Sequence, residues 1–178
     1  MVRVVAISGS RRSGSHTRST LRHALAAADE AGAATTLIDL GAVDLPLYDP
    51  DIDEQGESET LRQTVRDADG IIVGSPVYHG SYSSTFKNFH DYCSFDDYES
   101  TAVGLVAVAG GGSFGSTLEH LRSTIRGVHG WVLPHQVGIR GAYNKFAAGT
   151  LQDEELLDRT EQLGQSVAEH ARRLREED

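Results

Sequence analysis

Short apolar runs alternate with amphipathic helical patterns along almost the whole chain. The apolar runs predict strands at residues 3–8, 34–39, 70–75, 103–109 and 131–138. The first run contains Val4, Val5 and Ile7 without polar alternation, which is typical of a parallel strand buried on both faces. Five strands that alternate with helices predict a doubly wound α/β fold, in which helices cover both faces of a parallel sheet.

Helical patterns fill the intervals between the predicted strands. Leu21, Leu25 and Ala28 recur at i, i+4 and i+7, which is the spacing of one helix face. Similar spacings predict helices over about 17–31, 57–68, 82–93, 118–128 and 153–175. Ser58 is expected to cap the second helix. Two longer segments, 40–56 and 140–151, show no clear periodicity and are expected to be loops.

The composition favours a single domain over residues 1–178. A chain of this length can bury a sizeable core, and the sequence shows no internal repeat or linker. No secretory leader and no apolar run of about 20 residues is visible, so neither secretion nor a membrane span is expected. The one cysteine, Cys93, cannot form an internal disulfide, which is consistent with a reducing cytoplasm. Cys93 and Trp131 are both expected in the core.

The formal net charge of −10 argues against nucleic acid or an anionic membrane as a partner. Apart from Lys87 and Lys145, all the basic residues other than histidine are arginines. This acid-rich, lysine-poor composition is typical of a halophilic protein from a salt-rich cytoplasm. The eight histidines show no metal-ligand spacing, so no metal site is expected.

The turn after the first predicted strand, residues 8–17, is dense in hydrogen-bond donors. It contains four serines, a threonine, two arginines and two glycines, and it has no carboxylate. Because a helix begins at its end, unpaired backbone N–H groups and a partial positive charge add to these donors. The turn is therefore predicted to bind an anion such as a phosphate. The alternative is that its serines only cap the helix.

Two further loops, 75–81 and 109–115, follow the third and fourth predicted strands. In the strand order 2-1-3-4-5, strands one, three and four are neighbours, so all three loops are expected to line one cleft. The glycine loop Gly110-x-Gly112-x-x-Gly115 formally matches a dinucleotide-binding fingerprint, but no Asp or Glu occurs between residues 120 and 150. We interpret it as backbone that closely approaches a flat ligand, the alternative being a plain glycine turn.

Four segments carry a resemblance to a known family. They are Gly9-Ser10-x-Arg12-x-x-Ser15, Leu-Pro-Leu-Tyr-Asp at 45–49, Pro76-x-Tyr78-His79-Gly80-Ser81 and the glycine loop at 110–115. In this order they resemble the NAD(P)H-dependent FMN reductases, over residues 1 to about 135. The resemblance implies a flavodoxin-like doubly wound five-stranded parallel sheet in the order 2-1-3-4-5.

The resemblance also implies which residues bind FMN. The residues that it assigns to the phosphate are Ser10, Arg12, Ser15, His16 and Thr17. Those assigned to the isoalloxazine and ribityl chain are Pro76, Val77, Tyr78, His79, Gly80 and Ser81. Those assigned to the pyrimidine side of the ring are Gly110, Gly111, Gly112 and Ser113. His16 departs from the family pattern, which usually has Asn there, and makes the phosphate contact pH-dependent.

The implied activity is hydride transfer from NADPH or NADH through bound flavin to a small-molecule acceptor, such as a flavin or a quinone. The flavin performs this chemistry, so no catalytic side chain is assigned. Tyr48 and the 40–56 loop are expected to border the nicotinamide or acceptor site. The resemblance further implies a homodimer or homotetramer. The face formed by Tyr82, Phe86 and Phe89 is a candidate contact, the alternative being ordinary core.

Two other functions fit the same sequence. A flavodoxin-type electron carrier would share the fold, the size and the acidic surface, without nicotinamide chemistry. A non-redox domain would use the cleft for a nucleotide or phosphate. The Gly-Ser-x-Arg pattern favours the reductase over the carrier, and bound flavin would exclude the non-redox domain.

Overall fold

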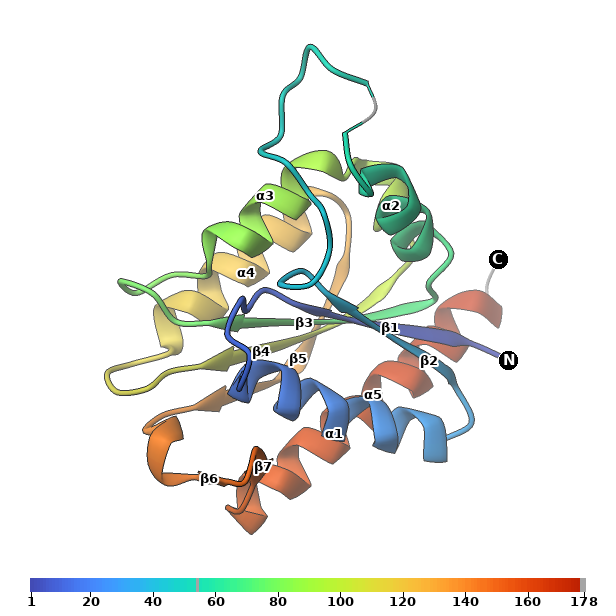
Figure 1. Ribbon diagram of the computed structural model, residues 1–178. Helices are drawn as coiled ribbons and strands as arrows, with labels where there is room; N and C mark the ends of the chain where they lie inside the picture. The colour runs from blue at the N-terminus through green and yellow to red at the C-terminus, as the bar shows by residue number, and fades with distance from the viewer. Residues whose placement is uncertain (54, 177–178) are drawn as a thin grey trace.

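The computed structural model describes residues 1–53 and 55–176. Its main sheet has five parallel strands in the order β2-β1-β3-β4-β5 (Figure 1). The strands are β1 (Arg3–Ser8), β2 (Ala34–Asp39), β3 (Gly70–Pro76), β4 (Ala102–Val108) and β5 (Trp131–Ile139). This arrangement confirms the predicted flavodoxin-like doubly wound sheet, and the predicted strand bounds differ from the observed ones by at most one residue.

Helices cover both faces of the sheet, as predicted. They are α1 (His16–Glu30), α2 (Ser58–Arg66), α3 (Ser84–Tyr92), α4 (Gly115–Gly127) and α5 (Glu154–Glu176). Figure 1 shows α1 and α5 on one face of the sheet and α2, α3 and α4 on the other. The second helix begins after Glu57, so Ser58 is its first residue rather than its cap, and that expectation was wrong.

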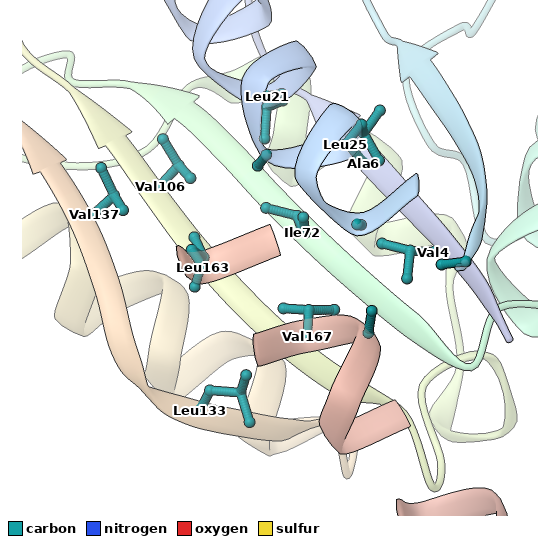
Figure 2. Packing of buried hydrophobic residues seen from close by; sticks show 14 of the residues in the cluster. Val4, Ala6, Leu21, Leu25, Ile72, Val106, Leu133, Val137, Leu163 and Val167 are labelled. Atoms are coloured by element: carbon teal, nitrogen blue, oxygen red, sulfur yellow. The ribbon is translucent and has the colours of Figure 1, made fainter. Parts of the chain in front are cut away.

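The core on the first face lies between the sheet and the pair α1 and α5. Figure 2 shows Leu21 and Leu25 of α1 and Leu163 and Val167 of α5 packed over residues of the strands. The two helices cross closely because α5 carries Gly164 at the contact. A Cβ on Gly164 would lie 1.9 Å from the carbonyl oxygen of Ala24, a distance that no side chain tolerates.

The core on the second face includes the aromatic residues of α3. Phe86 and Phe89 are fully buried, and Tyr82 and Cys93 are partly buried against the same cluster. Phe86 and Phe89 are therefore core residues, and the interpretation of this face as a subunit contact is wrong. The placement of Cys93 against the core is confirmed.

Two regions differ from the sequence-based expectations. Trp131 is 62% exposed rather than buried, because it begins β5, which is the edge strand of the sheet. Segment 140–151 is not an irregular loop. It contains a 3₁₀ helix, η2 (Ala142–Asn144), and an antiparallel hairpin formed by β6 (Phe146–Ala147) and β7 (Thr150–Leu151). Strands of two residues are too short to give a periodic signal.

Within residues 1–53 and 55–176, no helix combines the length and the apolar character that crossing a bilayer requires. In the same part of the chain, no three His, Cys, Asp or Glu side chains are grouped as ligands of a metal ion would be.

Candidate functional site

A cleft opens at the carboxyl edge of the sheet, where β1, β3 and β4 end. Its volume is about 340 Å³, within the range of roughly 300–1,000 Å³ that is typical of small-molecule sites. The three loops predicted to meet here do so, and segment 140–151 joins them. The lining residues are Ser10, Arg12, Gly14, His16, Thr17, Pro76, Val77, Tyr78, Val108, Gly110, Gly111, Ala142 and Tyr143.

The loop between β1 and α1 presents hydrogen-bond donors to the cleft. Its start is tied to β3, because Gly9 N donates to the carbonyl oxygen of Gly74 at 2.8 Å. The backbone N–H groups of His16 and Thr17, in the first turn of α1, donate to no other backbone group in the described part of the chain. Together with the Arg12 guanidinium, these N–H groups suit an anion.

Ser15 lies apart from the other residues predicted in this loop. It is buried and is not among the cleft residues. Its Oγ accepts a hydrogen bond from Arg18 N at 3.0 Å, so Ser15 is the N-cap of α1. The cap helps to hold the first turn of the helix, whose N–H groups face outward from its start.

Arg18 connects the 8–17 loop to the end of β2, a role that was not predicted from the sequence. Its Nη1 lies 2.6 Å from Asp39 Oδ2, at the end of β2. Its Nη2 donates to the carbonyl oxygens of Ser13 and Arg12. Both charged side chains are largely buried, at 17% and 23% exposed. One signal was available: Asp39 ends a strand next to β1, so its carboxylate lies beside the loop that follows β1.

His16 is held between aromatic rings. Its imidazole stacks on Phe146 of β6 at 4.3 Å between ring centroids, and it meets Tyr143 edge-on at 6.1 Å. Burial lowers the pKa of His16 from its ordinary value, and the nearby Arg12 guanidinium lowers it further. Both effects favour the neutral imidazole in the free protein.

The loop after β3 divides into two parts. Pro76, the last residue of β3, and the first loop residues, Val77 and Tyr78, line the cleft. The next residues, His79 and Gly80, form a tight turn with φ of 51° and 80°, closed by backbone hydrogen bonds between Tyr78 and Ser81. Positive φ at both central residues is typical of a type I′ turn.

Gly80 and Ser81 contact α4 and do not line the cleft. Ser81 Oγ lies 2.9 Å from His120 Nδ1, and Ser116 Oγ donates to the carbonyl oxygen of Gly80 at 2.6 Å. The structure therefore brings the first half of the predicted 76–81 set to the cleft. The second half, residues 79–81, does not line it.

The glycine loop after β4 is bare on its open side. Gly110 and Gly111 line the cleft, whereas Gly112 and Ser113 do not. A Cβ placed on Gly111 or Gly112 would meet no atom within 4 Å. In the described part of the chain, the backbone N–H groups of residues 110–112 donate to no other backbone group. The loop thus offers unpaired donors and open space.

Tyr143, from the 3₁₀ helix η2, joins the two sides of the cleft and was not predicted. Arg12 Nη1 donates to its hydroxyl at 3.3 Å. A Cβ on Gly110 would lie 2.6 Å from Cε2 of the same ring. Tyr143 is 65% exposed, so it forms an open wall rather than part of the core. Ala142, next to it, also lines the cleft.

Tyr48 does not reach the cleft. It packs edge-on against Tyr92 at 5.1 Å, and its backbone N donates to Asn88 Oδ1 at 2.9 Å. The backbone of Pro46 and Tyr48 is thus fastened to α3. The start of the segment instead lies beside the 8–17 loop, since a Cβ on Gly41 would lie 2.7 Å from the carbonyl oxygen of Ser10. In Figure 1 the chain after β2 then extends away from the edge where β3 and β4 end. Tyr48 therefore does not border the cleft, contrary to the expectation from the sequence.

The electrostatics of the cleft contrast with those of the whole chain. The formal net charge is −10, yet no carboxylate is among the residues that line the cleft. Arg12 is the cation there, and neutral hydroxyl, imidazole and backbone N–H groups surround it. A cleft of this composition favours an anionic ligand.

Comparison with known proteins agrees with this chemistry. Residues 2–144 match the sequence model of the NADPH-dependent FMN reductases. The chain belongs to this family. The match confirms the resemblance inferred from the four motifs, and with it a flavin enzyme that uses a nicotinamide donor.

Individual relatives extend the comparison. An FMN-dependent NADPH-azoreductase of Staphylococcus saprophyticus is 31% identical over 160 residues, which cover 84% of each chain. An NADPH azoreductase of a Bacillus species is 35% identical over 124 residues, or 67% of this chain and 65% of the relative. The structure of the NAD(P)H:(acceptor) oxidoreductase FerB from Paracoccus denitrificans superposes with a TM-score of 0.80 at 18% identity, covering 97% of this chain and 98% of FerB. At that identity the likeness to FerB establishes the fold.

Proposed function

We propose that this family member binds FMN in the cleft at the carboxyl edge of the sheet and reduces a small-molecule acceptor with electrons from NADPH. The observation that carries the proposal is that two loops of opposite character form two walls of the cleft. The 8–17 loop is rich in anion-binding donors, and the 110–112 loop is bare backbone with open space. An FMN molecule has the matching ends, a phosphate and a flat ring.

The residues of the cleft fit FMN in their chemistry. Ser10, Arg12, His16 and Thr17 supply hydroxyl, guanidinium, imidazole and helix N-terminal donors for the phosphate. Tyr78 and the bare backbone of Gly110 and Gly111 border the space for the ring. No lining carboxylate opposes the phosphate.

When bound, the flavin accepts a hydride from the nicotinamide and passes reducing equivalents to the acceptor. The chain's own contribution is to bind and orient. The 8–17 loop would anchor the phosphate end, and the N–H groups of Gly110 and Gly111 would stabilise negative charge on the ring. The absence of a side chain at Gly111 leaves room for a second flat molecule beside the ring.

The acceptor that we propose to test first is an azo compound. The similar proteins from Staphylococcus saprophyticus and the Bacillus species are named azoreductases. The open cleft, with Tyr78 and Tyr143 exposed at its edges, supports a flat aromatic acceptor. Quinones and free flavins have the same shape and are the next acceptors to compare.

The assembly and location of the protein belong to the same proposal. We infer a homodimer or homotetramer, supported by the exposed apolar side chains of Leu47, Tyr48 and Ile52 on one protruding segment. Light scattering of the purified protein tests this, and a monomer at micromolar concentration would contradict it. The packing of α5 on α1 supports one domain over residues 1–178. The partly buried, unpaired Cys93 supports a cytoplasmic location.

The test is a visible spectrum of the protein with FMN, before and after anaerobic addition of NADPH. The proposal predicts the bands of protein-bound oxidised flavin, which fade when NADPH is added and return when an azo dye is supplied. Bound flavin that stays oxidised with NADPH would indicate an electron carrier instead. Failure to bind FMN would contradict the proposal.

A further inference from the structure

His16 is placed so that an anion in the cleft would meet its imidazole. It is the first residue of α1 and lines the cleft together with Arg12. The ring lies nearly parallel to Phe146, with an interplanar angle of 8°, and the edge contact with Tyr143 borders it on another side. Two aromatic contacts thus fix the orientation of a side chain that would otherwise rotate freely.

Phe146, the aromatic platform on which His16 stacks, is held in place by further contacts. Phe146 pairs with Leu151 in the β6–β7 hairpin, and Ser19 Oγ of α1 donates to the carbonyl oxygen of Gly149 at 2.6 Å. The hairpin is therefore fastened to the same helix that carries His16. The imidazole and its aromatic support form one unit beside the 8–17 loop.

The charged and titratable groups around His16 are few. The Arg12 guanidinium faces it from the 8–17 loop, and the Tyr143 phenol faces it from η2. Lys145, next to Phe146, is paired with Asp153 at 2.9 Å. Burial and Arg12 both lower the pKa of His16, so the imidazole of the free protein is neutral near pH 7.

A phosphate dianion reverses this balance. An opposite charge within about 4–6 Å of a histidine favours the imidazolium, and a neutral imidazole offers at most one N–H donor where the imidazolium offers two. A dianion also has more charge than Arg12 alone can neutralise. We propose that His16 takes up one proton from solvent when FMN binds, so that the phosphate is held jointly by the Arg12 guanidinium and the His16 imidazolium.

This inference rests on the proposed function and makes FMN affinity depend on pH. The complex holds one more proton than the free protein at any pH between the pKa values of His16 in the two states. Raising the pH through that interval therefore weakens binding, by up to roughly tenfold for each pH unit. An Asn at position 16 has no group that titrates in this range and cannot produce this dependence.

The experiment is calorimetric titration of the flavin-free protein with FMN at pH 7.0, in phosphate-free buffers of different ionisation enthalpy. The dependence of the observed heat on the buffer gives the number of protons taken up. We expect a value close to one for the natural protein and close to zero for His16→Asn. Riboflavin, which lacks the phosphate, is expected to cause no proton uptake.

Matched controls separate the possible outcomes. His23→Asn, on the same helix but outside the cleft, should retain the proton uptake. Phe146→Leu keeps His16 and removes its platform, so it serves if His16→Asn does not fold, and it should reduce the proton number. An NMR titration should show the pKa of His16 rising when FMN is added.

Equal proton uptake by the natural protein and His16→Asn would overturn the inference while leaving FMN binding intact. Uptake with riboflavin would overturn it as well, because it would place the proton away from the phosphate. Absence of FMN binding by the natural protein would instead contradict the proposed function.

Discussion

The two walls of the cleft are built in opposite ways. The 8–17 wall consists of side chains that are held in place, with Arg12 and His16 directed at the cleft and Arg18 bridging the loop carbonyls to Asp39. The 110–112 wall consists of backbone from which side chains are missing. We therefore expect the first wall to bind the ligand through its side chains, and the second to accommodate the ligand because it has no side chains.

This difference teaches how each wall should respond to substitution. Removing a side chain should weaken the first wall and leave the second unaffected, whereas adding a side chain should damage the second. The ligand distinguishes them too, because riboflavin and FMN share the ring and differ in the phosphate. The following predictions use both contrasts, in order of decreasing effect.

Arg12→Ala should cause the largest loss of FMN affinity. Loss of hydrogen bonds to a charged group costs about 1.5–3 kcal/mol, or roughly 10–150-fold in affinity. Fluorescence titration measures it. Riboflavin affinity should change by less than about threefold, because the substitution removes only the contact with the phosphate. A similar loss for both ligands would show that Arg12 does not contact the phosphate.

Gly111→Val should weaken the binding of both FMN and riboflavin. Overpacking costs about 1–3 kcal/mol, or roughly 5–150-fold in affinity. Because a Cβ on Gly111 meets no protein atom within 4 Å, the melting temperature should not change. Gly127→Val is the matched control, since Gly127 is equally open and lies outside the cleft. Normal flavin affinity in Gly111→Val would place the ring elsewhere.

Arg18→Ala should weaken FMN binding indirectly, by about 1 kcal/mol or roughly fivefold. The side chain does not line the cleft but holds the loop that does. Arg18→Lys can keep a charge near Asp39 and cannot reproduce the forked contacts, so its affinity should lie between those of the natural protein and Arg18→Ala. Normal FMN binding by Arg18→Ala would show that the 8–17 loop keeps its conformation without the Arg18 contacts.

Tyr143→Phe should have the smallest effect. It removes a single exposed hydrogen bond, at 3.3 Å, from Arg12. The free guanidinium can then turn to the phosphate, so FMN affinity should stay within about threefold of the natural value. Tyr143→Ala removes the ring as well and should weaken FMN more than Tyr143→Phe does. Equal titration curves for the two variants would show that the ring contributes nothing.

The position of most of the cleft could be predicted from the sequence, because the loops that form it follow the carboxyl ends of predicted strands. Parallel strands bring residues 8–17, 76–78 and 110–111 to one edge whatever their separation along the chain. Tyr143 could not be predicted, because two-residue strands and a 3₁₀ turn leave no periodic pattern. The contacts of Arg18 were missed because an arginine in a first helical turn is ordinarily solvated, and only Asp39 at the end of the neighbouring strand indicated a partner.

Other misses have equally local causes. Trp131 was expected in the core because it begins a strand, but the position of β5 at the sheet edge leaves that end uncovered. The tight turn at His79 and Gly80 directs the second half of the 76–81 loop to α4. A motif gives the identity of such residues but not the direction in which a turn sends them.

A crystal structure of the complex with FMN tests the central claim most directly. The account predicts the phosphate within hydrogen-bond distance of Arg12 and the first turn of α1, with the ring against Gly110 and Gly111. A phosphate at the glycine loop, or a flavin bound outside the cleft, would contradict it.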